Sequence, residues 1–241
     1  FMCDYIEATT GLPQASYDLW EEKYGTSTYT ASAVYGGLMA AARFALVLGK
    51  DQDARTYQAV AQRLQSAIME VLYDDNLGMF VKHVTHDADG ELEFDKTLDT
   101  SSFYGPILYE VADIDDPKIV KAAKTVETNL RVEANSAGYV RYQNDGYYRM
   151  RDAESPNPWV ITTLWMAQYH IKKAKRLKDL EPALALLEWT SSHATTGGVL
   201  AEQMHPHTRA HLSTAPLVWS HAEYVLAVDA YLKKQAELTA K

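Results

Sequence analysis

Apolar residues recur every three or four positions through most of this chain, which is the spacing of one face of an α-helix. Leu38, Ala42 and Ala45 form such a stripe near the N-terminus. The same pattern predicts helices over residues 28–48, 51–73, 97–111, 117–130, 158–177, 180–192 and 217–238. The short link at Lys50 predicts that the first two helices are antiparallel neighbours. Residues 1–7 resemble the end of a further helix, so the pattern gives seven or eight helices.

The helical period breaks between residues 74 and 94. Two short apolar runs, residues 78–81 and 91–94, flank the sequence Asp87-Ala88-Asp89-Gly90. An Asp-Gly pair between such runs favours a tight turn. This segment therefore predicts one β-hairpin in an otherwise helical chain.

Two long segments show neither the helical spacing of apolar residues nor the pattern of a β-strand. Residues 132–157 are rich in Tyr and Gly, and residues 195–216 are rich in Gly, His and Pro. Loops of this length in a compact domain are often functional. The helices thus form pairs joined alternately by short and long links, and we expect the chemistry on the long links.

Composition narrows the function classes. The formal net charge of −9 argues against a nucleic-acid surface. No apolar run approaches the ~20 residues of a membrane span, so neither nucleic acid nor a membrane is expected as a partner. The single cysteine, Cys3, excludes internal disulfides and fits a reducing compartment. A cytoplasmic location is therefore expected in preference to secretion.

Two carboxyls lie in tryptophan-bearing settings far apart in the chain. Glu21 belongs to Tyr17-Asp18-Leu19-Trp20-Glu21-Glu22, and Glu202 precedes the segment Leu217-Val218-Trp219. Hydrolysis of a glycosidic bond needs such a pair, in which one acid protonates the leaving oxygen and the other activates water or attacks the sugar. Taken alone, Glu21 and Glu22 also suit a solvated helix start, and Glu202 suits an exposed loop.

Other candidates are equally open when taken one at a time. Arg141 and Tyr142 lie in the first long loop, where an arginine is often only a surface residue. Trp159 and Trp219 suit either a packed core or the wall of a sugar pocket.

Metal binding is not expected. His205, His207, His211 and His221 cluster late in the chain, but no carboxylate or cysteine completes a metal site. The acidic residues near the predicted hairpin lack the regular spacing of a calcium loop. The sequence therefore predicts no metal and no cofactor.

Five segments, in order along the chain, carry a family resemblance. They are Gly11-Leu12-Pro13 with Tyr17-Asp18-Leu19-Trp20-Glu21-Glu22, then Gly138-Tyr139-Val140-Arg141-Tyr142 with Asp145, then Asn157-Pro158-Trp159, then Ala201-Glu202-Gln203, and finally Trp219-Ser220-His221-Ala222. Together they resemble the C-terminal part of the catalytic domain of glycoside hydrolase family 15, which holds glucoamylases, glucodextranases and some trehalases.

The resemblance implies an all-α fold, an (α/α)6 toroid of about twelve helices. With seven or eight helices here, the toroid would be incomplete, and residues 1–241 would form the C-terminal portion of the catalytic domain. Apolar faces near residues 1–10 and 28–48 would then be exposed. The missing N-terminal part of the same protein, or a second copy, would cover them.

The resemblance also implies roles for residues in the first candidate segment. Glu21 would be the general acid, and Glu22 would contact sugar hydroxyls near the scissile bond. Asp18 would set the environment of the acid, and Trp20 would pack against it.

In the later segments, the resemblance makes Glu202 the general base, with Gln203 orienting it. Arg141 and Tyr142 would line the first sugar subsite, with Asp145 holding the arginine, and Trp159 and Trp219 would wall the pocket. Met204 stands where many family members carry an aromatic residue, so one sugar contact would be absent.

The expected function is therefore an inverting, exo-acting hydrolase that releases glucose from an α-glucosidic oligosaccharide or disaccharide. Linkage stays open between α-1,4, α-1,6 and trehalose. The competing hypothesis is a non-catalytic fragment, or a regulatory or carbohydrate-binding toroid.

Overall fold

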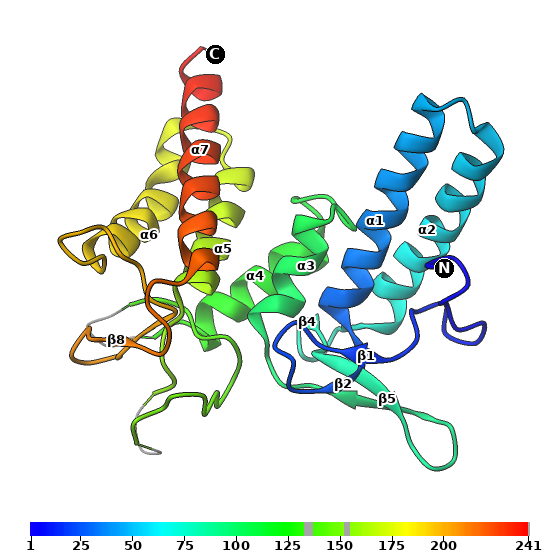
Figure 1. The fold of residues 1–241 in the computed structure, drawn as a ribbon, viewed down its shortest axis with the longest axis horizontal. Helices are drawn as coiled ribbons and strands as arrows, with labels where there is room; N and C mark the ends of the chain where they lie inside the picture. Colours follow the sequence, from blue (N-terminus) through cyan, green and yellow to red (C-terminus); the bar gives the residue numbers. More distant parts are fainter. Residues whose placement is uncertain (133–136, 152–154, 241) are drawn as a thin grey trace. The chain divides into compact units, whose positions relative to one another are not determined.

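Helices dominate the computed structural model, which describes residues 1–132, 137–151 and 155–240 (Figure 1). The chain forms two compact units, Phe1–Thr125 and Val126–Lys241. The helices are α1 (Thr28–Val47), α2 (Asp51–Val71), α3 (Thr100–Leu108), α4 (Pro117–Asn129), α5 (Val160–Lys173), α6 (Glu181–Ser192) and α7 (Val218–Thr239), with a 3-10 turn, η1 (Leu177–Leu180). Seven α-helices in the described part of the chain confirm the predicted all-α class.

In the first unit, α1 packs against α2 and α3. The side chain of Ser27 caps α1 by accepting a hydrogen bond from the backbone N–H of Thr30 (3.1 Å). The stripes predicted from the sequence face inward, with Leu38, Leu64 and Ile68 almost fully buried. The helical periodicity therefore placed this part of the core correctly.

The C-terminal end of α1 is also apolar. Phe44, Leu46, Val47 and Leu48 are exposed, as expected from an incomplete toroid. By length and composition this helix could cross a membrane, with a mean hydropathy of 1.3 over its most apolar window. The expectation that no run approaches this limit was wrong, because alanines and glycines extend the apolar stretch. A core helix passes the same test, so the finding is weak evidence for a membrane.

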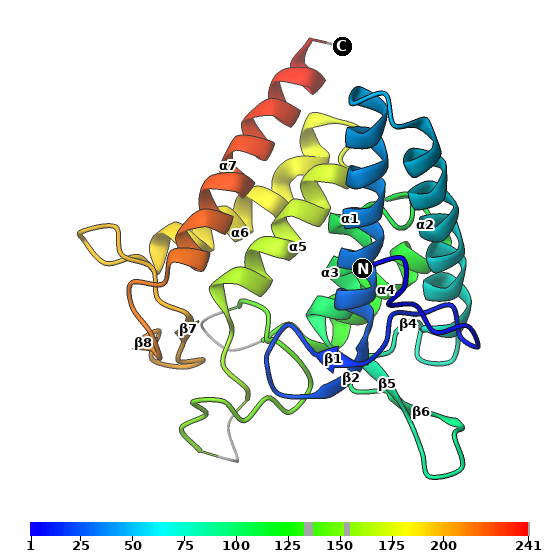
Figure 2. The ribbon, with the colours of Figure 1, turned by 45° about the vertical axis from the view of Figure 1, so that its right-hand side comes forward.

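A four-stranded antiparallel sheet lies in the same unit, in the order β1 (Ser16–Tyr17), β2 (Tyr24–Ser27), β5 (His83–His86) and β6 (Leu92–Asp95). Gly25 is required in β2, because a Cβ there would meet the His83 ring at 2.7 Å and the Val84 carbonyl oxygen at 2.9 Å. Figure 2 shows the β5–β6 hairpin extending from this sheet.

Two predictions in this unit need correction. The predicted turn at residues 87–90 is present, but its first strand is β5, because β4 (Met79–Phe80) pairs instead with β3 (Tyr73–Asp74). Residues 1–7 do not end a helix. They form turns and a bridge between Ile6 and Pro13, which the positive φ of Gly11 (71°) allows.

In the second unit, α5 packs against α6 and α7. The long loop before α7 holds a small hairpin, β7 (Gln203–Met204) with β8 (His211–Leu212), which the sequence did not predict. The core joins all three helices to this loop through Val160, Leu164, Leu187, Leu200, Ala201, Met204 and Ala227. The loop is therefore anchored by buried apolar side chains.

Candidate active site

The first candidate carboxyls lie in a loop between paired strands. Residues 18–23, the acid loop, connect β1 to β2, and Tyr17 lies opposite Tyr24 in the register. The Asp18 N–H donates to the Lys23 carbonyl (2.9 Å), and Asp18 Oδ1 accepts from the backbone N–H groups of Glu22 (2.9 Å) and Lys23 (3.3 Å). Asp18 thus folds the loop around its own carboxylate, as aspartates do in tight turns.

Glu21 lies at the bend of this loop with φ = 59°, in the left-handed region. Its N–H donates to the Asp18 carbonyl (3.1 Å). A non-glycine residue in this region is strained, and such strain gathers at functional sites. The side chains of Glu21 and Glu22 are both exposed.

Asp18 differs from these two acids because it is buried, with 7% of its surface exposed. Oδ2 of its carboxylate is buried and has no hydrogen-bond partner among the described residues. Buried polar atoms are nearly always satisfied, so this oxygen calls for an explanation.

Trp20 ties the acid loop to the core. Its indole N–H donates to Asp99 Oδ2 (2.9 Å), and Lys82 Nζ lies 3.3 Å from the same oxygen. Asp99 is also the N-cap of α3, where Oδ1 accepts from the Ser101 N–H (2.7 Å). Burial raises the pKa of Asp99, while Lys82, Ser101 and Trp20 oppose that rise.

The sequence analysis missed both Asp99 and Lys82. An aspartate before Thr100-Ser101 is a usable signal of a helix N-cap. Nothing in the pattern around Lys82 marked it.

The second candidate carboxyl, Glu202, lies in the base loop, residues 195–216. Its N–H donates to the Thr214 carbonyl (2.9 Å), and its carbonyl accepts from the Val160 N–H (3.1 Å). Ser220 Oγ donates to the carbonyl of Ala201 (2.8 Å). Backbone bonds on both sides therefore fix the Cα position of Glu202.

A chain of amides holds the Glu202 side chain. Gln203 is fully buried, and its Nε2 donates to Glu202 Oε2 (3.3 Å). The Gln203 Oε1 atom accepts in turn from Asn157 Nδ2 (2.8 Å), which also donates to the Tyr148 carbonyl (3.0 Å). Asn157 is a functional candidate that the sequence analysis quoted in a motif without giving it a role.

Arg141 lies in an aromatic cage. Its Nε and Nη2 donate to the two oxygens of Asp145 (2.7 and 2.8 Å), a forked geometry that only arginine provides. The guanidinium carbon lies 4.4–5.0 Å from the ring centres of Tyr142, Tyr147 and Trp159. The predicted holding of Arg141 by Asp145 is thus present.

The backbone of Trp159 joins this cage to the base loop. It forms bridges with both Tyr139 and Gln203. The structure therefore brings together Arg141, Tyr142, Trp159, Gln203 and Glu202.

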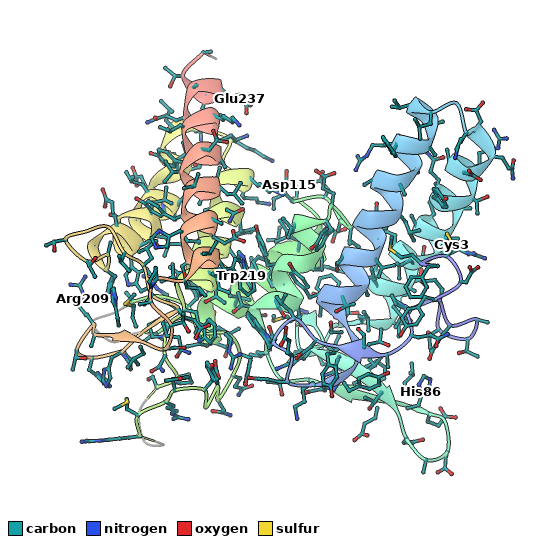
Figure 3. The ribbon with its side chains drawn as sticks, viewed as in Figure 1. Cys3, His86, Asp115, Arg209, Trp219 and Glu237 are labelled. Carbon is teal, nitrogen blue, oxygen red and sulfur yellow. The ribbon has the colours of Figure 1, made fainter. Side chains whose placement is uncertain are left out.

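Trp219 lies near the N-terminal end of α7 (Figure 3). Its ring is 6.0 Å from that of Trp165, and its Nε1 donates to Glu223 (3.2 Å). These contacts tie the indole to α5 and α7, and they do not link it to the arginine cage.

The late histidines serve the loop's own structure. His205 Nδ1 accepts from the N–H groups of His207 and Thr208 (both 3.2 Å), and His221 Nε2 accepts from the Leu200 N–H (3.1 Å). Within the part of the chain that the structure describes, no three or more metal-binding side chains gather at one place.

An all-α fold whose loops carry two candidate carboxylates and a caged arginine is typical of the class of all-α glycoside hydrolases. The chain belongs to glycosyl hydrolases family 15, whose family model it matches over residues 2–229.

Similar proteins agree with that assignment. The chain is 28% identical to an uncharacterized glycosyl hydrolase of Methanocaldococcus jannaschii, over 88% of this chain and 33% of that protein. It is 27% identical to a glucoamylase of Clostridium sp., over 89% of this chain and 33% of that protein. The chain thus spans about a third of the length of these relatives.

The structure is similar to that of a bacterial glucoamylase complexed with acarbose, with a TM-score of 0.79 and 25% identity. The match covers 97% of this chain and 37% of the other. This likeness confirms the prediction of a partial (α/α)6 fold.

Proposed function

We propose that this chain, as the C-terminal portion of a catalytic domain, supplies the acid and the base of an inverting, exo-acting glycoside hydrolase. The enzyme releases glucose from the ends of α-glucosidic substrates. The observation that carries the proposal is one loop with the exposed Glu21, closed by Asp18, and a second loop whose Glu202 side chain is held by Gln203, in a chain that belongs to a family of glycosidases.

Glu21 is the general acid of the proposed reaction. Its exposed carboxyl gives its proton to the glycosidic oxygen as the bond breaks. Glu22 binds sugar hydroxyls beside it, and the unpartnered Oδ2 of Asp18 accepts a further hydrogen bond when substrate is bound. Trp20 provides an aromatic surface beside the acid.

Glu202 is the general base. Because Gln203 donates to Oε2, the other oxygen of the carboxylate is available to take a proton from water. Inversion needs the acid and the base about 6.5–9.5 Å apart, with the water between the base and the sugar.

The aromatic cage around Arg141 forms the sugar subsite. The guanidinium, forked to Asp145, takes part in binding sugar hydroxyls. Tyr142, Trp159 and Trp219 supply ring faces for the sugar. No metal or cofactor takes part in this chemistry.

An α-1,4-linked oligosaccharide leads among the substrates, and α-1,6-linked glucose and trehalose follow. The alternative function is non-catalytic carbohydrate binding, which the buried Arg141 cage would also support. The exposed face of α1 is covered by another part of the protein or by a second copy.

Glucose release by the full-length protein tests the proposal, with maltotriose, isomaltose and trehalose as substrates. Glu202→Gln should lower kcat by about 10²–10⁴-fold with little change in KM, because the amide cannot accept the proton. Glu188→Gln, an exposed acid on α6, is the matched control and should leave kcat unchanged.

Wild-type turnover that survives Glu202→Gln would contradict the assignment of the base. A wild-type protein that binds these sugars but releases no glucose would favour the non-catalytic alternative.

A further inference from the structure

Two side chains from distant segments and one nearby backbone N–H converge on one buried carboxylate. Asp99 is fully buried and Lys82 is 4% exposed. Asp99 Oδ2 receives both the indole N–H of Trp20 and the ammonium of Lys82, while Oδ1 receives the Ser101 N–H. None of the proposed chemistry uses Asp99 or Lys82 directly.

The free-energy cost of burying both charges indicates that this arrangement does more than fill the core. A buried ion pair adds little net stability over apolar residues of the same shape, because both charges lose their hydration. The α3 N-cap alone would need only one oxygen of Asp99, which asparagine or serine would also supply. The second oxygen, with its lysine, is committed to Trp20.

Trp20 directly precedes Glu21, which adopts a strained backbone conformation. Such a conformation persists only where surrounding contacts determine it fully. On the C-terminal side of Glu21, the Asp18 carboxylate binds the backbone N–H groups of Glu22 and Lys23. On its N-terminal side, the indole bond to Asp99 fixes Trp20.

We propose that Asp99, paired with Lys82, is a positioning residue for the proton-donating carboxyl of Glu21, acting through the indole of Trp20. The proposal rests on the proposed role of Glu21 as general acid. It predicts that breaking the indole bond impairs protonation of the leaving group and spares the rest of the reaction.

Two substrates separate these effects in the full-length protein. Maltose has a poor leaving group that needs protonation, whereas α-glucosyl fluoride does not. Trp20→Phe deletes the indole N–H and leaves the Asp99–Lys82 pair intact. Asp99→Asn leaves one accepting oxygen, which cannot serve both Ser101 and Trp20.

Both variants should lower kcat on maltose by about 10²-fold, as small displacements of a catalytic group do, and should change kcat on α-glucosyl fluoride much less. The double variant should lose no more on maltose than Asp99→Asn alone, because the indole bond is already absent in that variant. Glu21→Gln serves as the reference, because it shows how kcat on the two substrates changes when the acid itself is absent.

Asp116→Asn is the matched control. Asp116 Oδ1 accepts from the Lys118 N–H (2.8 Å) at the start of α4, so the same chemical change alters a helix start that has no bond to Trp20. This variant should treat both substrates as the wild type does.

The indole N–H resonance of Trp20, assigned by its absence in Trp20→Phe, gives a readout that does not depend on activity. Asp99→Asn should move it upfield and speed its exchange with solvent, and Asp116→Asn should leave it in place. An unmoved resonance would overturn the proposal.

Equal losses on the two substrates, or no loss, in Trp20→Phe would also overturn it, provided that Glu21→Gln shows the selective pattern. If Glu21→Gln itself lacks that pattern, the proposed acid is wrong and the positioning role fails with it.

Discussion

In the acid loop, Glu21 is exposed at a strained bend, and the loop is closed by the Asp18 carboxylate and by backbone groups within residues 18–23. In the base loop, Glu202 lies between the buried residues Ala201 and Gln203, and the side chains of Ser220 and Asn157 bind these two neighbours. One carboxylate thus lies on a loop held by its own residues and by one distant bond, from Trp20 to Asp99, and the other is held by non-local packing and a buried polar chain.

The two loops should therefore respond differently to substitutions. The acid loop should tolerate changes outside its own segment, except through Trp20 and its partners. The base loop depends on Asn157, Trp159 and the arginine cage, so changes there should cost stability as well as activity. Three changes test this comparison, and they follow in order of expected effect.

The largest effect should come from Asp145→Asn. Arg141 is buried, and removing its carboxylate partner leaves a buried charge unpaired, which typically costs about 3–5 kcal/mol. We expect the free energy of unfolding to fall by that amount. Amide hydrogen exchange should show the lost protection in residues 138–151 and in the base loop, with the acid loop unaffected.

Asp179→Asn is the control for this change. Arg176 and Asp179 form a similar fork on the surface (2.9 and 3.3 Å), where solvent screens both charges. Asp179→Asn should lower the free energy of unfolding much less than Asp145→Asn does. Equal losses, or lost protection in the acid loop, would contradict the idea that burial makes the base region sensitive.

A smaller effect should follow acidification. His170, on α5, has its pKa lowered to about 4, chiefly by burial and further by Arg131. Its Nε2 lies 3.4 Å from Glu127 Oε1, which would favour a charged histidine, but burial also raises the pKa of Glu127. Burial dominates for the histidine, so His170 is neutral near pH 7.

The sign of the effect follows from proton uptake. An unfolded histidine titrates near pH 6.5, so the unfolded chain binds more protons between pH 6.5 and 4. The contribution of neutral His170 is complete above pH 6.5 and is lost as the pH falls, by about 2 kcal/mol at pH 5. His170→Gln should remove that part of the pH dependence, measured by urea unfolding at pH 7 and 5. If the free energy of unfolding of His170→Gln changes between pH 7 and 5 as much as that of the wild type does, His170 does not titrate as expected.

The smallest effect concerns the strain in the acid loop. Glu21→Gly relieves the positive φ, whereas Glu22→Gly only adds freedom to the unfolded chain. Glu21→Gly should therefore be more stable than Glu22→Gly by about 1 kcal/mol, while it abolishes turnover. Thermal unfolding of both variants checks this, and the reverse order of stability would mean that Glu21 is not strained.

The sequence predicted local features well and non-local ones poorly. Apolar spacing located helices such as α2 and α7, because that signal depends only on residues within a few turns. It missed that Met79–Phe80 pairs with Tyr73–Asp74, since two short apolar runs can pair in several registers. The β7–β8 hairpin was not predicted, because each of its strands has only two residues and shows no alternating pattern.

The same limit applies to the candidate site. Asp18, Glu21, Arg141 and Gln203 were predicted through motifs. Asp99 and Lys82 were not, because the bond from Trp20 to Asp99 joins residues 79 positions apart, and only the fold brings these three residues together. Trp219 was predicted as a pocket wall, and its observed contacts are with Trp165 and Glu223.

The most direct test of the central claim is the configuration of the first product. The full-length protein would be followed by proton NMR while it hydrolyses an α-linked substrate, before the anomers of glucose equilibrate. If Glu21 is the acid and Glu202 the base for an attacking water, β-glucose must form first. If α-glucose forms first, a covalent intermediate exists, Glu202 acts as a nucleophile, and the assignment of a general base is wrong.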